Sequence, residues 1–403
     1  MRAPPFDTIV APATPVGRSA LAIVRIDGPR SGEMLATLAG EAGGRPDPRV
    51  ATFYHLGDID ECIAIRYVAP HSFTGNDLVE LTLHGNPLLV ERVIEACVAL
   101  GARIAQPGEF SERAVLNGKI DLVQAESIAD LINARTALQA KLSLANLDGL
   151  LSRSASSIRD SLLHVISRFE AALDFSEEGY DFITRDEARA RIERALRDVE
   201  TLAETFRRGR ATVTGLNAVI LGKPNAGKST LLNRLVGSER AIVTPIPGTT
   251  RDIVRETIEI GGLPVTLADT AGLRASGDLV ESIGIDRARE AARQAEIVLY
   301  LVDASAGIDA HDHKELLLIT NPILIFTKTD LSPAPEDELG ISVMAETGID
   351  ELLRRLDALV RDRFAAPEQA AALVNERQRA AVADCAAALR ASLEALSSGF
   401  EEQ

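Results

Sequence analysis

Short runs of apolar residues alternate with longer amphipathic stretches in the second half of the chain. Four runs are continuous and bounded by turn residues: 218–221, 265–268, 297–302 and 323–326. Runs of this length are typical of strands that are buried on both faces of a parallel sheet. The pattern therefore predicts a largely parallel α/β sheet covered by helices.

The rest of the chain shows two other patterns. Up to about residue 113 the sequence is mixed, with strands expected at 21–26 and 63–68, which predicts a small α+β domain. From 124 to 206 apolar residues recur every three or four positions, which predicts amphipathic helices that pack on each other. Residues 209–215 are interpreted as a connector. The alanine-rich tail from 367 to 403 is expected to be helical and to dock on the earlier helices.

Composition and charge narrow the class of protein. A chain of 403 residues, 46% of them hydrophobic, is long enough for two or three domains with separate cores. Three unpaired cysteines and the lack of a long apolar run or secretory signal predict a cytoplasmic protein without a disulfide framework or membrane span. A net charge of -16 argues against nonspecific coating of nucleic acid.

The sequence Gly222-Lys-Pro-Asn-Ala-Gly-Lys-Ser229 has the spacing of a phosphate-binding loop (P-loop). It lies between a predicted strand and a predicted helix, which is the context that this motif requires. Glycines let backbone N–H groups approach phosphates, and the helix N-terminus adds its dipole. Lys228 is expected at the β- and γ-phosphates and Ser229 on Mg²⁺. The nucleotide contacts expected from this loop are Asn225, Ala226, Gly227, Lys228, Ser229 and Thr230.

Two later motifs are expected to complete the magnesium and γ-phosphate site. The stretch 247–252 (Pro-Gly-Thr-Thr-Arg-Asp) is interpreted as a first switch, and Asp-Thr-Ala-Gly follows an apolar strand at 269–272. Each alone is as well explained by a turn, but their order after a P-loop favours the phosphate site. Thr250 and Asp269 are expected to hold Mg²⁺, and the N–H of Gly272 to meet the γ-phosphate. Thr270 and Ala271 belong to the same predicted contact set.

A base-selecting motif, Thr327-Lys-Thr-Asp330, follows the last apolar run. The carboxylate of Asp330 can accept hydrogen bonds from guanine N1–H and N2–H₂, which adenine cannot offer, so GTP is expected in preference to ATP. Thr327 stands where a G protein has Asn, and Met344 stands where a lysine is usual, so a weaker base pocket is expected. The predicted base contacts are Thr327, Lys328, Asp330 and Ser342.

The group that orients the attacking water is not evident from these motifs. Leu273 occupies the position where Ras-type proteins place a glutamine, and leucine cannot orient a water. Either the protein is a slow switch that needs a partner, or another residue serves. Glu281 is the nearest uncommitted carboxylate, although alone it would be interpreted as a solvated helix start.

Four N-terminal blocks resemble the bacterial tRNA-modification GTPase family MnmE, also called TrmE; they are 7–18, 72–80, 107–113 and 116–122. Other GTPases lack these blocks, and the resemblance runs from Asp7 to about Leu352. It implies a multidomain fold of α/β and α+β type. Its parts would be an N-terminal folate-binding and dimerisation domain (1–118), a helical domain (119–210 and 367–403) and an inserted Ras-like P-loop G domain (214–366).

The resemblance also implies roles for individual residues. Arg25, Glu80 and Lys119 fall on positions that bind 5-formyl- or methylene-tetrahydrofolate. Glu281 falls on the residue that orients the attacking water, so that the implied catalytic residues are Glu281, Lys228 and Gly272. A K⁺ ion that stimulates hydrolysis, where other systems insert an arginine finger, would be held by Asn225, Thr244, Ile246 and Thr249, two of which (Thr244 and Thr249) also belong to the predicted nucleotide site.

The function implied by the resemblance is the GTP-hydrolysing part of a complex that places a (carboxymethyl)aminomethyl group on C5 of the tRNA wobble uridine. The implied partners are a second copy of the chain, an FAD-containing MnmG-type protein in a heterotetramer, and tRNA. Two alternatives are a ribosome-assembly or RNA-binding GTPase switch and a degenerate paralogue that modifies nothing. The family's C-terminal Cys-Ile-Gly-Lys stretch is not found before Gln403, so weaker folate binding with retained dimerisation is expected.

Overall fold

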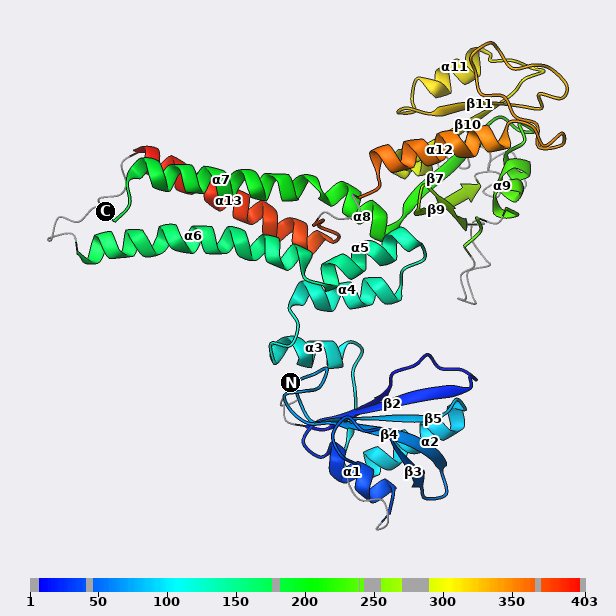
Figure 1. Ribbon diagram of the computed structural model, residues 1–403. Helices are drawn as coiled ribbons and strands as arrows, with labels where there is room; N and C mark the ends of the chain where they lie inside the picture. Colours follow the sequence, from blue (N-terminus) through cyan, green and yellow to red (C-terminus); the bar gives the residue numbers. More distant parts are fainter. Residues whose placement is uncertain are drawn as a thin grey trace. The chain divides into compact units, whose positions relative to one another are not determined.

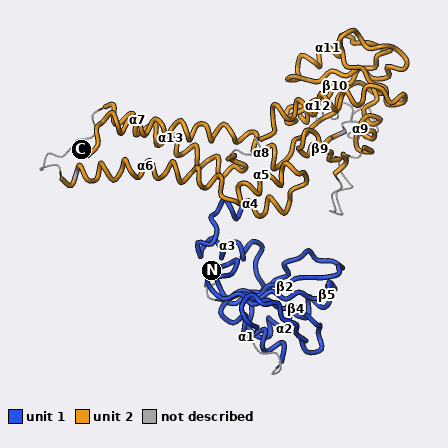
Figure 2. Tube along the Cα trace, in the orientation of Figure 1, with its two compact units in different colours: residues 1–126 blue, residues 127–403 orange. Residues whose placement is uncertain are grey.

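The computed structural model describes residues 7–40, 46–175, 182–238, 240–242, 255–269, 290–366 and 371–398. The chain divides into two compact units, residues 1–126 and 127–403 (Figure 2). Each unit has its own sheet and its own hydrophobic core, and each is described by itself below.

The first unit is an α+β domain around a sheet of order β3-β4-β5-β2-β1-β6 (Figure 1). Its strands are antiparallel neighbours, except that β1 and β6 run parallel. The elements are β1 (Ile9–Pro12), β2 (Leu21–Asp27), α1 (Ser31–Leu38), β3 (Thr52–Leu56), β4 (Asp60–Tyr67), β5 (Leu78–His84), α2 (Pro87–Ala99), β6 (Arg103–Ile104), α3 (Glu109–Leu116) and, across the unit boundary, α4 (Leu122–Ile132). The two strands expected from the sequence are confirmed as β2 and β4.

Alternation along β2 separates a core face from a polar face. Val24 and Ile26 are fully buried and share a core with residues of α1 and α2. Arg25 lies between them and is half-buried, which is the pattern of a strand with one face against the core. Arg25 pairs in register with Glu80 of β5, so that the two side chains leave the sheet on the same face.

The second unit contains the predicted parallel sheet, in the order β11-β10-β7-β9-β8. All neighbours are parallel except the antiparallel pair β8 and β9. Aliphatic residues of β7, β9 and β10 form one core with those of α9 and α12. The elements are β7 (Leu216–Gly222), α9 (Lys228–Val236), β8 (Arg255–Ile260), β9 (Leu263–Asp269), β10 (Ile297–Asp303), α11 (Ala310–Leu316), β11 (Ile323–Thr327) and α12 (Ile349–Arg363).

The same unit contains a helical layer built from two distant parts of the chain. Its elements are α5 (Ala137–Leu147), α6 (Leu150–Asp174), α7 (Arg185–Glu204), α8 (Phe206–Thr214) and α13 (Glu376–Ser398). Figure 1 shows α13 beside α7, where Val165, Val199 and Leu389 share one core and Arg390 donates to Glu200 at 2.5 Å. The expected docking of the C-terminal tail on the earlier helices is therefore confirmed.

The interpretation of 209–215 as a connector is wrong, because residues up to Thr214 belong to α8. The glycine that suggested a break serves close packing instead. A Cβ at Gly209 would lie 2.2 Å from the carbonyl oxygen of Leu373, so the segment before α13 can cross α8 only where the side chain is absent. A glycine in a helix costs about 1 kcal/mol relative to alanine, which tertiary packing can offset.

Candidate functional site

The P-loop of the second unit connects β7 to α9 through three residues with positive φ. Gly222 has φ 135°, and a Cβ there would lie 2.3 Å from the Leu301 carbonyl oxygen of the neighbouring strand. Gly227 caps α9 at φ 88°, while Asn225 has φ 64°, a conformation that asparagine adopts more readily than most residues. This backbone leads into a helix N-terminus, which is a favourable site for an anion.

Lys228 is folded back across this loop. It is buried, and its Nζ donates to the carbonyl oxygens of Gly222 at 2.8 Å and Lys223 at 2.6 Å. Ser229 and Thr230 follow it in the first turn of α9 and are exposed. The ammonium group is therefore held within the loop that the sequence predicts to bind phosphates.

Thr327 connects the P-loop to the sheet. Its buried hydroxyl lies 2.9 Å from the Ala226 carbonyl oxygen and 3.2 Å from that of Val302, so that it can donate to either. The first residue of the base motif therefore contacts the phosphate loop, although 101 positions separate the two residues in the sequence. The sequence alone suggested only the loss of an asparagine at this position.

The charged residues of the base motif are oriented by their neighbours. Ser342 is buried and donates to Oδ1 of the exposed Asp330 at 2.6 Å, which brings together two residues that were predicted separately. Lys328 donates to Asp303 at the end of β10 at 2.6 Å. The hydrogen bond from Lys328 lowers the pKa of Asp303. The carboxylate of Asp330 is therefore held by Ser342 and exposed to solvent.

Several predicted site residues lie outside the described residues. They are Thr244, Ile246, Thr249, Thr250, Thr270, Ala271, Gly272 and Glu281. Asp269 ends β9, but only its backbone is described, in register with Ile220 of β7. Their roles remain predictions from the sequence.

Two of the predicted folate residues of the first unit pair with each other, and the third has a different partner. Arg25 donates to Glu80 at 2.5 and 3.0 Å, and Tyr67 donates to the same carboxylate at 3.3 Å. Lys119 instead donates to the Pro70 carbonyl oxygen at 3.1 Å. Burial, with the negative charge of Glu80, raises the pKa of Tyr67.

Sequence reasoning did not name two aromatic residues that contact Arg25. The guanidinium carbon of Arg25 lies 5.3 Å from the centre of the Phe73 ring and 5.5 Å from that of Phe110. Both distances are within the range of cation–π contacts. Each phenylalanine lies in one of the N-terminal sequence blocks, and this location was the sequence signal that could have indicated a role for both. Together they make a half-buried polar and aromatic surface.

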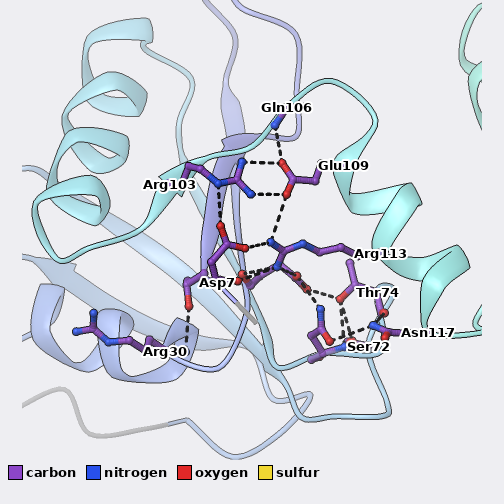
Figure 3. A network of polar contacts seen from close by, with 12 residues as sticks. Asp7, Arg30, Ser72, Thr74, Arg103, Gln106, Glu109, Arg113 and Asn117 are labelled. Carbon is purple, nitrogen blue, oxygen red and sulfur yellow. Dashed lines mark hydrogen bonds and ion pairs between the residues drawn. The ribbon is translucent and has the colours of Figure 1, made fainter. Parts of the chain in front are cut away.

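Arg113 is the centre of a buried polar network in the first unit (Figure 3). It donates to Asp27 at 2.8 Å, to the Asp7 carboxylate at 2.5 Å and to Glu109 at 3.3 Å. Asp27 is fully buried and also accepts from Thr74 and Asn76. Three of the sequence blocks thus meet in one network, which fixes the loops on either side of Phe73 and Phe110.

Glu109 makes the stability of this network depend on pH. Hydrogen bonds from Arg103 at 2.6 and 3.0 Å lower the pKa of Glu109 to about 2. Because the folded pKa lies below the unfolded one, the stabilisation is complete above about pH 4.5 and is lost as the pH falls toward 2.

We expect Glu109→Gln to lower the free energy of unfolding of the first unit by on the order of 2 kcal/mol at pH 7, and by much less at pH 2.5. Urea unfolding of the full chain, followed by circular dichroism at both pH values, measures the difference. Glu33→Gln, at an exposed carboxylate paired with Arg30, is the matched control and should change little. An equal loss at both pH values would contradict the prediction.

Comparison with known proteins matches both parts of the chain to one protein family. The family profile for the N-terminus of the GTP-binding protein TrmE matches residues 8–119, and the profile of the MnmE helical domain matches residues 122–403. The tRNA modification GTPase MnmE of Koribacter versatilis is 39% identical over 407 residues, which cover 97% of this chain and 89% of that protein. That of Symbiobacterium thermophilum is 41% identical over 419 residues, covering 98% and 91%.

The chain belongs to the MnmE family. This confirms the resemblance that the N-terminal blocks indicated, and it makes the chain a homologue of the MnmE GTPases. Among solved structures, part of this MnmE-family chain is similar to Era of Aquifex aeolicus (26% identity, TM-score 0.29, 36% of this chain and 56% of that chain). No helix among the residues that the structure describes is long and apolar enough to cross a membrane.

Proposed function

We propose that this chain hydrolyses GTP as part of a complex that modifies the C5 position of the tRNA wobble uridine. The observation that supports the GTPase activity is the link between the P-loop and the base motif. Thr327 ties the loop at Ala226 to the strand that leads to Asp330, and Ser342 orients the Asp330 carboxylate. The relatives with similar sequence are tRNA modification GTPases, which supports the wider function.

The residues present fit a nucleotide bound with Mg²⁺. The P-loop has glycines with positive φ at Gly222 and Gly227, and the exposed Ser229 in the first turn of α9 is a suitable hydroxyl ligand. Mg²⁺ would be held by Ser229, Thr250 and Asp269 and would neutralise charge on the phosphates. Lys228 would donate to phosphate oxygens, and Asp330 would accept hydrogen bonds from guanine.

A second cation is proposed at Asn225, whose left-handed backbone places it on the exposed side of the P-loop. With Thr244, Ile246 and Thr249, Asn225 would hold K⁺, which would supply positive charge between the phosphates. Glu281 would orient the attacking water, because Leu273 carries no polar group. The pairing of two G domains is part of this proposal.

The N-terminal unit is proposed to bind 5-formyl- or methylene-tetrahydrofolate. Arg25 and Glu80 offer a cation for carboxylates and an acceptor for pterin N–H groups, and the Phe73 and Phe110 rings offer surfaces for a planar ligand. Lys119, which follows α3, is proposed as a third contact of the ligand. The proposed assembly is a homodimer joined with an FAD-containing MnmG-type partner, which acts on tRNA in the cytoplasm.

Mass spectrometry of tRNA nucleosides after deletion of the gene tests the proposed function. We expect the C5 modification of wobble uridines to be lost and to return when the gene is restored. Unchanged wobble uridines together with a ribosome-assembly defect would favour a GTPase switch. Unchanged uridines without any such defect would favour a degenerate paralogue.

Replacement of Asp330 by asparagine is expected to shift nucleotide preference from guanine toward xanthine. The amide can donate to the xanthine O2 where the carboxylate accepted from guanine, so XTP affinity should rise as GTP affinity falls. Competition binding with GTP, XTP and ATP measures this, with the exposed Asp350→Asn on α12 as a control. Equal affinity of the unchanged protein for ATP and GTP would refute the assignment of Asp330.

A further inference from the structure

Lys223, the residue after the first glycine of the P-loop, is held by two carboxylates. Its Nζ lies 2.6 Å from Asp309 and 2.7 Å from Asp312, at the start of α11. Asp309 caps this helix by accepting from the N–H groups of His311 and Asp312. The hydrogen bond from Lys223 lowers the pKa of Asp309, and the hydrogen bonds that Lys223 donates to both carboxylates raise the pKa of Lys223.

The inner carboxylate is buried and fully connected. Asp312 is 1% exposed and accepts from the Tyr300 hydroxyl at 2.9 Å and from the Asp309 N–H at 3.1 Å. Tyr300 is itself buried and lies on β10, paired in register with Leu221 of β7. A buried carboxylate that loses its cationic partner is costly, so this ion pair restrains the lysine more firmly than an exposed pair would.

The backbone of Lys223 carries this restraint to Lys228. The Lys223 carbonyl oxygen accepts from Lys228 Nζ at 2.6 Å, and Gly222 beside it is pressed against Leu301 of β10. The side chain of Lys223 is therefore fastened to α11, while its carbonyl holds the ammonium group that is predicted to bind the phosphates. Neither role was apparent from the motif, in which this position accepts any residue.

We propose that Lys223 is a positioning residue: by its ion pairs with Asp309 and Asp312 it fixes the first turn of the P-loop and, through its carbonyl, places Lys228 for the β-phosphate of the nucleotide. This inference rests on the proposed guanine-nucleotide site. On this proposal the start of α11 affects phosphate binding, because a displacement of Asp312 would also displace Lys223 and the P-loop. A preformed P-loop binds the nucleotide more tightly than an unrestrained one, because less conformational entropy is lost on binding.

Binding of GDP that carries a fluorescent N-methylanthraniloyl group tests the proposal in the full chain. Lys223→Met is expected to weaken binding about tenfold, mainly through faster dissociation, as for residues coupled within one network. Lys223→Arg keeps a cation that can bridge two carboxylates and should restore binding to within about threefold. GMP, which lacks the β-phosphate, should compete with unchanged affinity, whereas general damage to the domain would weaken GMP as well.

A matched control is Arg240→Met. Arg240 has a side-chain exposure of 37%, close to the 35% of Lys223, and pairs with Asp357 of α12 in the same unit at 2.9 Å. It should bind the probe as the unchanged protein does. If Lys223→Met does not fold, Tyr300→Phe, which removes only the buried hydroxyl that donates to Asp312, should still speed dissociation.

Wild-type dissociation in folded Lys223→Met, or equal weakening in Arg240→Met, would overturn the positioning role. Wild-type dissociation in Tyr300→Phe would do the same where Lys223→Met cannot be folded. Failure of the unchanged protein to bind the GDP probe would instead overturn the proposed GTPase function, so the two failures are distinguishable.

Discussion

Replacement of K⁺ by Na⁺ at matched ionic strength is expected to slow GTP hydrolysis by about a hundredfold, the usual cost of removing one electrostatic stabiliser of a transition state. Leu273 cannot orient a nucleophile, and no arginine is assigned to the charge that develops between the phosphates. Asn225 is exposed and has a left-handed backbone conformation, and its side-chain oxygen is the ligand proposed for the cation.

The experiment compares phosphate release in KCl and NaCl for three variants. Asn225→Ala should abolish the difference between the salts and still bind nucleotide, whereas Asn233→Ala, at an exposed asparagine of α9, should keep it. Glu281→Ala should be slow in both salts. If the unchanged protein turns over equally in both, the potassium mechanism is wrong, and Arg251 and Arg274 become the candidates for an arginine finger.

Arg113→Met is expected to destabilise the first unit by about 3–5 kcal/mol, because it leaves a buried carboxylate without its cationic partner. Asp27 is fully buried, and Arg113 supplies the positive charge among the contacts described for it. Methionine has a similar length but no donor, so the change removes the pairing more than the packing.

Urea unfolding of the full chain measures this loss, and nucleotide binding by the second unit should persist. Arg92→Met is the matched control, since Arg92 pairs with the exposed Asp58, and it should cost less than about 1 kcal/mol. Adding Asp27→Asn to Arg113→Met should recover part of the loss by removing the buried charge. A loss below about 1 kcal/mol for Arg113→Met would show that the network does not depend on this pair.

The elements that could be predicted were those with a local signal. The continuous apolar runs around residues 218 and 297 predicted β7 and β10, because a strand buried on both faces needs apolar side chains at every position. Helix α8 was missed because glycine disfavours helices, and Gly209 was therefore interpreted as the start of a connector. The reason for a glycine inside this helix is the close approach of the Leu373 carbonyl, which is distant in the sequence.

Among the functional residues, too, those with a local sequence signal could be predicted and those that depend on tertiary contacts could not. The P-loop is defined by spacing within eight residues, so the sequence was sufficient to place it. The partners of Lys223, Thr327 and Arg113 come from other elements, and only folding brings them within hydrogen-bond distance. Charged residues are mostly exposed, so the sequence offered no reason to expect Arg113 or Asp312 to be buried.

The pairing of α13 with α7 also sets the order in which the molecule can be built during translation. Residues of α6 and α7 leave the ribosome well before α13, with the whole parallel sheet synthesised in between. At ordinary rates of chain elongation this interval is on the order of ten seconds. The apolar residues of α6 and α7 that pack on α13 therefore stay uncovered until this last helix has been synthesised.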